Sequence, residues 1–599
     1  MRTKPILRLG LILFIVWGMA LLLGACQPLG ERSEHANPDW SRGLRLGRAS
    51  VNDAVALLPA PGGERLYLAW VTRRHYDGRE LLHITQREAS GRLVSEREVE
   101  EIEVYHPVSV RLAPAGGLLH LFWVDGPASE RTLFHALVDG RGWLHKEPQP
   151  LSPSGLSVNG YALASQPDGS IALVMSASEG AKAGLFLVRL AEDGGILLAS
   201  TPLGAAGVDP ALQSDAASTL HLLWAEELTY GERALYYGTI ASPSYVLASP
   251  TRLASFPAGL GLVNHPPALA LVGEQVYAFW SIERRGGGLT APMANTFYTV
   301  FPLGKPEEAL APRQVIIPPW NHPLYTEVKS ALPVRHLASI GHGEEASDFI
   351  YFPYTPEGFQ GEELPVAFAV EVVGRTKRIV QVIMTYWRGG GELFGYQIAG
   401  QTASASSHPV LARDDQGNLH LAWLDTAGFG NYDVYYASTS PAARAYLNRW
   451  TLSDLATRLL NFLWGVVQAM GFMPVILAWG FLPLVIIVVY VLFVPEADLT
   501  QRTSLAVLGF ASLLYVALKY SLRPGWLMAL PLPPGLPSDT ADLLILFAPL
   551  AISAMAALFT ALWCRRKQFA VSIFPAFGLF VLADALMTLI LYVPAVLRE

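Results

Sequence analysis

The chain has 599 residues, which is too long for one ordinary hydrophobic core, so at least two domains are expected. Charged residues make up 16% of the chain, apolar residues 51%, and the formal net charge is −7, so no basic field points to nucleic acid. The two cysteines, Cys26 and Cys564, lie near opposite ends of the sequence, which excludes a disulfide framework and a cysteine-based zinc site.

The N-terminus has the pattern of a secretory signal, in which basic residues precede the apolar run Leu9–Leu23. The run ends in Leu-Gly-Ala-Cys at residues 23–26, which resembles the bacterial lipobox. The resemblance implies that residues 1–25 are a lipoprotein signal peptide and that Cys26 is lipidated. A linker, residues 26–39, would then follow outside the cytoplasmic membrane. An uncleaved signal anchor with an incidental cysteine is the alternative.

A unit of about 50 residues recurs between residues 40 and 440 and predicts the fold of this part of the chain. Each unit begins with a polar residue and a proline or its substitute, followed by a short apolar strand and a Gly/Asp turn. A second strand of the form Leu-His-Leu-x-Trp, an aromatic third strand and a hairpin signal come next. The units start near Ala54, Pro107, Tyr161, Pro210, Pro266, Pro323 and Pro409, and the second-strand tryptophans are Trp70, Trp123, Trp224, Trp280 and Trp423.

Four short strands per unit, repeated about seven times, are typical of a β-propeller, with six or eight blades as the alternatives. The last unit stops after its third strand near Ser440, so we expect Trp40–Arg48 to supply the missing strand and close the ring. The strands that follow Pro323 are the hardest to place. We interpret the repeated tryptophans as core between blades, and His120, His221 and His420 as sheet-surface residues.

The Leu-x-Leu-x-Trp strand, which ends beside an acidic loop, resembles the sialidase-like extracellular propellers over roughly residues 40–440. The Asp-box motif of that family, Ser-x-Asp-x-Gly-x-Thr-Trp, is absent from this sequence, and no arginine triad can be assigned. The resemblance therefore implies an extracellular propeller and does not predict sialidase activity.

Polar residues at the entry of each first strand predict a ring of side chains at the mouth of the central channel, where a ligand site is first sought. A second set, two residues after the tryptophans, is expected to reach the same face. Such a ring of histidines and aspartates could hold a divalent cation. The alternative is that each entry residue only caps its own turn before proline. The entry residues are Asp53, His106, Asp209, His265, His322 and His408, with Asn159 one position earlier, and the second set is Asp125, Glu226 and Asp425.

The last part of the chain, residues 475–599, contains four apolar runs long enough to cross a bilayer of about 30 Å. A shorter run, Leu459–Met470, lies in a linker of residues 441–474 and is interpreted as an interfacial helix or a turn. The basic cluster at residues 565–567 puts the propeller outside by the positive-inside rule. Lys519 and Asp584 fall at similar depths and are expected to pair within the bundle. The four runs are Val475–Val494, Ser504–Leu522, Ala541–Trp563 and Phe569–Val593.

The sequence thus predicts an all-β propeller of about seven four-stranded blades, followed by an all-α bundle of about four transmembrane helices. It places the chain in a bacterial cytoplasmic membrane with the propeller on the extracytoplasmic side. Because no catalytic signature is found, the favoured function is a binding or sensing module for a ligand, glycan or partner protein. The alternatives are a surface glycosidase-type hydrolase that uses carboxylates such as Asp125, Glu226 or Asp425, and an accessory subunit that docks a membrane-protein partner through its helices.

Overall fold

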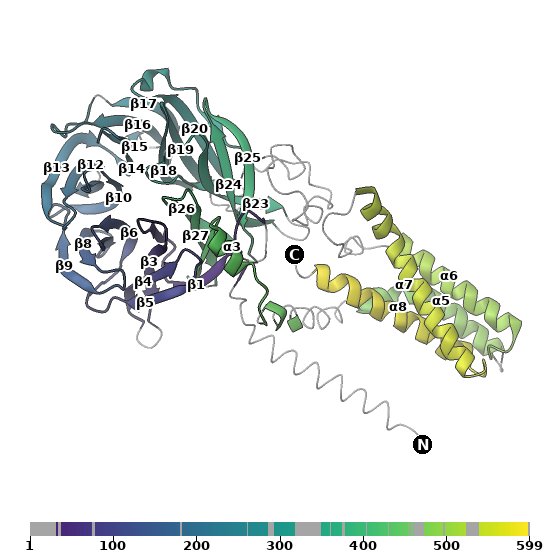
Figure 1. Ribbon diagram of the computed structural model, residues 1–599. Coiled ribbons are helices and arrows are strands. Elements are labelled where there is room, and N and C mark those ends of the chain that lie inside the picture. The colour runs from purple at the N-terminus through teal and green to yellow at the C-terminus, as the bar shows by residue number, and fades with distance from the viewer. Residues whose placement is uncertain are drawn as a thin grey trace.

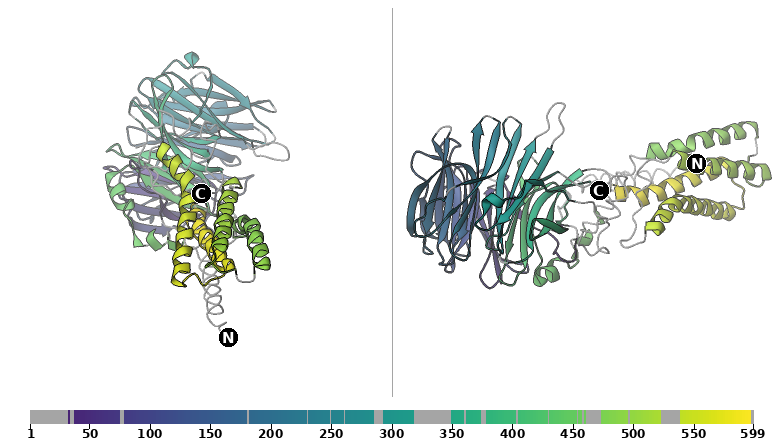
Figure 2. Two further views of the ribbon diagram at one scale, coloured as in Figure 1. Left: turned by 90° about the vertical axis from the view of Figure 1, so that its right-hand side faces the viewer. Right: turned by 90° about the horizontal axis from the view of Figure 1, so that it is seen from above.

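The computed structural model describes residues 32–317 and 349–596, except for short stretches, the longest of which are 285–292, 461–472 and 523–537. Cys26, and with it the lipobox, lies outside the described residues, as does nearly all of the run Leu459–Met470. The chain forms a ring of β-sheets and a separate bundle of helices (Figure 1). The ring is a seven-bladed propeller in which every blade is a four-stranded antiparallel sheet, as predicted, and Figure 2 shows it from two further directions.

Each second strand is apolar along nearly its whole length because neighbouring blades cover both of its faces. In Leu118–Asp125 seven of the eight residues are buried, whereas the outer strand Ile196–Ala206 has no buried residue. Blade 1 consists of β2 (Ala56–Pro59), β3 (Arg65–Arg73), β4 (Glu80–Glu88) and β5 (Leu93–Glu98), and blade 2 of β6 (Val108–Ala115), β7 (Leu118–Asp125), β8 (Thr132–Val138) and β9 (Leu144–Pro150). Blade 3 consists of β10 (Ser157–Ser165), β11 (Ile171–Glu179), β12 (Lys182–Leu190) and β13 (Ile196–Ala206), and blade 4 of β14 (Val208–Ser214), β15 (Leu220–Thr229), β16 (Glu232–Ile240) and β17 (Thr251–Pro257). Blade 5 consists of β18 (Leu262–Val272), β19 (Gln275–Arg284), β20 (Met293–Pro302), the short helix η1 (Pro306–Glu308) and β21 (Arg313–Gln314), and blade 6 of β22 (Ile350–Tyr354), β23 (Leu364–Val373), β24 (Arg378–Arg388) and β25 (Glu392–Gly400).

Blade 7 joins the two ends of the propeller sequence. Its first three strands are β26 (Ser406–Arg413), β27 (Leu419–Thr426) and β28 (Tyr432–Ser438), and its outer strand is β1 (Leu44–Ala49) from the other end of the domain. β1 pairs antiparallel with β28, and Arg45 forms an ion pair with Asp433 at 2.6 Å. The expectation that this N-terminal stretch closes the ring is therefore confirmed, and the closure gives blade 7 the same four strands as the other blades.

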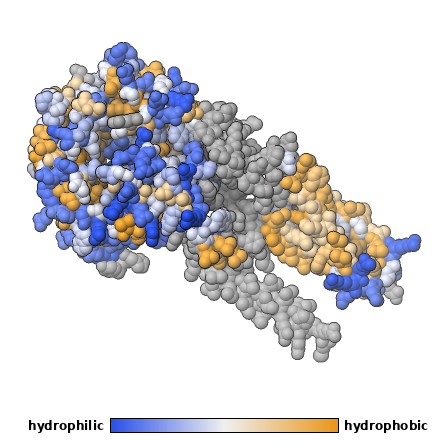
Figure 3. Space-filling view, viewed as in Figure 1, coloured by the Kyte–Doolittle hydropathy of each residue, from blue (hydrophilic) through white to orange (hydrophobic). Residues whose placement is uncertain are grey.

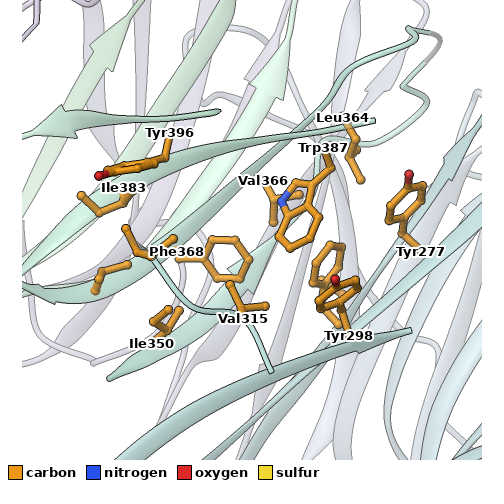
Figure 4. Packing of buried hydrophobic residues seen from close by; sticks show 14 of the residues in the cluster. Tyr277, Tyr298, Val315, Ile350, Leu364, Val366, Phe368, Ile383, Trp387 and Tyr396 are labelled. Carbon is orange, nitrogen blue, oxygen red and sulfur yellow. The ribbon is translucent and has the colours of Figure 1, made fainter. Parts of the chain in front are cut away.

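Blade 6 is the blade that the sequence pattern places least well. Its first described strand begins at Ile350, and the unit start expected at Pro323 lies outside the described residues. The apolar segments that were hard to place form β23, β24 and β25. Trp387 of β24 packs against Tyr298 of blade 5 with ring centroids 4.7 Å apart, in the cluster between these blades that Figure 4 shows.

The repeated tryptophans are core residues, as predicted, since each of the five is at most 3% exposed. The aromatic third strand explains the regularity of the repeat, because its ring lies directly opposite the tryptophan and the two rings stack. Centroid separations run from 5.5 to 5.9 Å in the pairs Trp123–Phe134, Trp224–Tyr236, Trp280–Phe297 and Trp423–Tyr435.

The prediction that the second-strand histidines lie on a sheet surface is wrong, because His120, His221 and His420 are all buried. In blade 7, His420 lies 2.9 Å from the Tyr436 hydroxyl and 3.1 Å from an Asp414 carboxylate oxygen. Blade 4 repeats this arrangement with Asp215, His221 and Tyr237, and blade 2 pairs His120 with His135 at 2.8 Å. Both faces of a propeller sheet are covered, so a polar residue that alternates with apolar ones is still buried and needs partners.

The C-terminal part contains four helices that are long and apolar enough to cross a membrane, which supports membrane association. Figure 3 shows an apolar surface on the bundle, with hydrophilic residues gathered at the end remote from the propeller. α8 packs against each of the other three helices. The helices are α5 (Met473–Phe493), α6 (Arg502–Ser521), α7 (Ser538–Arg566) and α8 (Ile573–Val596).

A buried polar network joins three of these helices. Lys519 of α6 places its Nζ 2.9 and 2.8 Å from the two carboxylate oxygens of Asp584 on α8. Tyr515 and Ser553 donate hydrogen bonds to the same carboxylate at 2.8 and 2.6 Å, and Lys519 donates to Thr588 at 3.0 Å. An ion pair in an apolar bundle is tolerated when further hydrogen bonds satisfy its members in this way.

Removal of one member of this ion pair is expected to destabilise the bundle more than removal of both. Lys519→Met leaves a buried carboxylate without its cation, which typically costs about 3–5 kcal/mol, whereas the double variant Lys519→Met, Asp584→Leu leaves no charge behind. The free energy of unfolding of the single and the double variant is measured by unfolding the full chain with a denaturing detergent and recording tryptophan fluorescence. Equal losses in the single and double variants would contradict the prediction.

The tryptophan packing leaves no room for a side chain at certain glycines. A Cβ at Gly207 would lie 2.4 Å from Cδ1 of Trp224, so Gly207→Ala should cost about 1–3 kcal/mol as overpacking does elsewhere. Gly160→Ala is the matched control, since a Cβ there meets nothing within 4 Å. Thermal unfolding of the two variants should show a lowered midpoint for the first and little change for the second.

Candidate functional site

The first strand of most blades carries a bulge close to its entry, where its pairing with the second strand shifts register. At the bulge in four blades stands a residue other than glycine with positive φ. These residues are Ser109 (53°), Asp209 (52°), Phe352 (55°) and His408 (47°). A positive φ is uncommon in residues other than glycine, and residues with this conformation cluster at ligand sites. Their repetition at one position around the propeller axis therefore marks the entry of the channel.

The seven first strands surround a cavity of about 320 Å³, and every blade contributes to its wall. Of the entry residues predicted from the sequence, Asp53, Asp209, His265 and His408 line this cavity, as does Asn159. Residues that sequence reasoning missed also line it, notably Arg111, Tyr161, Phe352, Tyr354 and Glu357. Tyr161 and Phe352 stand near the entry of their strands but are not polar entry residues in the repeat, whereas Arg111, Tyr354 and Glu357 lie further along a first strand or in a loop.

A loop of blade 6, residues 355–359, extends from the end of β22 toward three other blades. The Thr355 hydroxyl donates to the Leu269 carbonyl of blade 5 at 2.8 Å, and the Gly358 amide donates to the Gln213 side chain of blade 4 at 3.2 Å. Arg413 of blade 7 lies over the Phe359 ring at 5.2 Å. The loop therefore spans the far end of the channel and carries Glu357 into the cavity.

Several entry residues have partners within the protein. Asp53 accepts hydrogen bonds from the amides of Ala54 in its own blade and Ser109 in blade 2. His265 lies 3.0 Å from a Glu283 carboxylate oxygen, and Asp209 lies 3.5 Å from Arg233. These contacts agree in part with the alternative interpretation, in which the entry residues hold the turns and the neighbouring blades together.

Arg111 is the cation of the cavity. Its Nη1 donates to the carbonyl oxygens of Val110 at 3.1 Å and Ala54 at 3.5 Å, and within the described residues it forms no ion pair. Burial lowers the pKa of Arg111, but interactions with Tyr354 in its ionised form and with the Asp53 carboxylate outweigh burial and leave the pKa raised. The guanidinium is therefore charged and has N–H groups directed at no described partner.

The same low-dielectric surroundings shift the acidic and imidazole groups toward their neutral forms. Glu357 is exposed by its accessible surface, yet the surrounding cavity wall desolvates its carboxyl group and raises the pKa from 4.5 to about 7, while nearby Arg111 opposes the shift. Burial likewise raises the pKa of Asp209 and lowers that of His408 to about 4. A carboxyl group that titrates near neutrality inside a cavity is a candidate for binding or proton transfer.

The other predicted residues lie elsewhere. His106 precedes its strand and is exposed beside Glu80, because the bulge of blade 2 forms at Ser109 and not next to Pro107. His322 lies outside the described residues. Asp125, Glu226 and Asp425 still belong to strands β7, β15 and β27 and do not line the cavity.

The buried aspartates of this second set accept hydrogen bonds from nearby protein groups and do not face the cavity. Asp125 accepts hydrogen bonds from the amides of Tyr105, His106 and Gly126, and Asp425 accepts from Ser406 and Trp423. Among the described residues, no group of three His, Cys, Asp or Glu side chains converges as a metal site would require.

Comparisons with known proteins return fold-level likenesses only. No family model matches the chain, and no curated protein matches it. Among solved structures, the polysaccharide lyase Uly1 is 9% identical with a TM-score of 0.40, over 65% of this chain and 89% of its own. An α-L-arabinofuranosidase from Fusarium graminearum is 10% identical (TM-score 0.35, 55% and 92%), and an endo-arabinase from Bacteroides thetaiotaomicron is 11% identical (TM-score 0.29, 65% and 96%). Likenesses this low carry no weight on function.

The raised pKa of Glu357 predicts a pH-dependent stability. Between pH 4.5 and about 7 the folded state binds more protons than the unfolded state, so the stability of the natural chain falls as pH rises through this window. Glu357→Gln removes this titration. The thermal midpoint of the variant minus that of the natural chain should therefore increase from acidic to neutral pH. Glu362→Gln serves as control, because Glu362 is also exposed but does not line the cavity, and a constant difference across the window would contradict the prediction.

Proposed function

We propose that this chain is a membrane-anchored, extracytoplasmic propeller that binds a small polyhydroxylated ligand of the glycan class in its central cavity. The volume of about 320 Å³ lies in the usual range of small-molecule pockets, roughly 300–1,000 Å³. A stable protein partner needs about 800 Å² of complementary surface on each side, which a cavity of this size does not offer. The cavity therefore favours a small ligand over a partner protein.

The observation that carries the proposal is the position of Arg111 among acidic groups with which it forms no ion pair. Asp53 and Glu357 act electrostatically on its guanidinium, yet in the part of the chain that the structure describes neither carboxylate forms an ion pair with it. A ligand hydroxyl can accept a hydrogen bond from the guanidinium and donate one to a carboxylate at the same time. Tyr161 and Phe352 add aromatic surface to the same wall, which suits the apolar face of a sugar ring.

The orientation rests on two features at opposite ends of the sequence. The lipobox resemblance places the residues after Cys26 outside a bacterial cytoplasmic membrane. Arg565 and Arg566 end α7 and Lys567 follows it, at the same end of the bundle as Arg502 of α6, and this hydrophilic end is remote from the propeller in Figure 3. By the positive-inside rule that end is cytoplasmic and the propeller is outside.

A glycosidase-type hydrolase is the second candidate function, with carboxylates that differ from those expected from the sequence. Glu357, with a pKa of about 7, has the property of a general acid, and Asp53 and Asp209 line the same cavity as possible partners. Asp125, Glu226 and Asp425 have no access to this cavity. The hydrolase and the binding module thus share one site and differ in turnover.

The ligand proposal predicts that binding depends on Arg111. The full chain in lipid nanodiscs is screened against neutral, uronate-containing and sialylated oligosaccharides, and hits are titrated calorimetrically. Arg111→Met should weaken a hit by about 10- to 100-fold, as loss of a charged hydrogen bond worth roughly 1.5–3 kcal/mol requires. Glu226→Gln, outside the cavity, should leave the affinity unchanged.

Two outcomes would decide against parts of this proposal. A hit that binds the Arg111→Met variant as tightly as the natural chain would place the ligand elsewhere. Release of sugar products by the natural chain, lost in Glu357→Gln while binding is retained, would establish the hydrolase in place of the binding module.

A further inference from the structure

The chain leaves the propeller through a tightly bonded junction. After β28 it forms α3 (Pro441–Leu447), whose Ala443 and Leu447 are buried against blade 7. A second helical stretch begins directly after Thr451. Its start is a capping box, because the Thr451 amide and hydroxyl both donate to Asp454 at 2.8 Å and the Asp454 amide donates back to the Thr451 hydroxyl at 3.2 Å.

This helix start is held to the N-terminal segment that precedes β1. Arg42 forms an ion pair with Asp454 at 2.9 Å, and the Arg42 amide donates to the Asn448 side chain at 2.7 Å. Both members of the ion pair are mostly buried. The direction in which the helix leaves the propeller is therefore set by contacts with the domain and not only by a linker.

The outer face of the junction is apolar and exposed to solvent. Trp450 is 62% exposed, Leu452 86%, Leu455 61% and Leu459 57%. The three leucines are spaced by three and four residues, which places them on one side of a helix. Tyr446 and Arg449 are exposed beside them, and an apolar patch is visible at this place in Figure 3. We call Trp450, Leu452, Leu455 and Leu459 the junction face.

Both routes from the propeller toward the membrane pass through this junction. In one direction the chain enters α5 at Met473, 14 residues after Leu459. In the other, Arg32 donates hydrogen bonds to the carbonyl oxygens of Leu447 at 3.2 Å and Arg449 at 2.9 Å. Arg32 stands only six residues after Cys26, a separation of about 20 Å at most. The junction face is thus close along the chain to both the predicted lipidation site and the apolar helices.

We propose that the junction face lies in the lipid headgroup region and fixes the propeller against the bilayer on its blade 7 edge. The leucines enter the acyl boundary, Trp450 and Tyr446 occupy the interface where amphipathic rings are favoured, and Arg449 meets lipid phosphates. The proposal goes beyond ligand binding and does not depend on it. Its occupant is the bilayer, because the face is continuous in sequence with the apolar helices that associate with membrane.

The test measures the depth of this face in the full chain. An encoded fluorescent amino acid replaces Leu455 in one sample and Leu197, 56% exposed on the outer strand of blade 3, in a second. Each chain is placed in phosphatidylcholine nanodiscs with a nitroxide quencher on the upper acyl chain, and iodide is added as the aqueous quencher. The nitroxide should quench position 455 strongly and position 197 hardly at all, and iodide should do the reverse.

Two results would overturn the proposal. Iodide quenching of position 455 as strong as that of position 197 would put the face in water, and protection from both quenchers would mean that protein covers it. A sample with the label at Leu452 repeats the measurement on the same face. Thermal midpoints equal to that of the natural chain show that the labelled proteins are folded.

Discussion

β1 lies hydrogen-bonded against β28, so the first strand of the domain completes a blade whose other three strands come from residues 406–438. Without this pairing, blade 7 would expose the edge of β28 and the ring could open between blades 7 and 1. Closure holds the seven first strands around one axis, and the central cavity exists only because all seven converge. It also brings Arg32 and Arg42 against the segment that contains Leu447, Asn448, Arg449 and Asp454, which builds the junction through which the chain continues toward the apolar helices.

The charged groups of the helical bundle and those of the propeller cavity are satisfied in different ways. In the helical bundle Asp584 accepts hydrogen bonds from Lys519, Tyr515 and Ser553, so the group is satisfied by the protein and has nothing left to offer a ligand. In the propeller cavity Arg111 is bonded to two backbone carbonyls while acidic groups remain close but unpaired with it. The first arrangement fixes how helices pack, and the second leaves hydrogen-bonding capacity facing an open space.

The candidate site could be predicted from the sequence only in part. The entry residues Asp53, Asp209, His265 and His408 recur at one place in the repeat, so a pattern located them. Arg111 and Glu357 belong to no repeated position, and a loop of blade 6 carries Glu357. His106 was misplaced because proline was used to locate the entry, whereas the backbone bulge at Ser109 defines it.

The sequence by itself determined the propeller, its closing strand and the four apolar helices, because strand alternation, turn chemistry and hydrophobic length are local properties of a chain. The depth of Lys519 and Asp584 in their apolar runs also predicted their ion pair, but in the propeller tertiary structure decided which polar residues meet. The burial of His120, His221 and His420 follows from neighbouring blades that cover both faces of each sheet, and the raised pKa of Glu357 follows from its surroundings in the cavity. These properties depend on residues far apart in sequence, and only the closed ring brings them together.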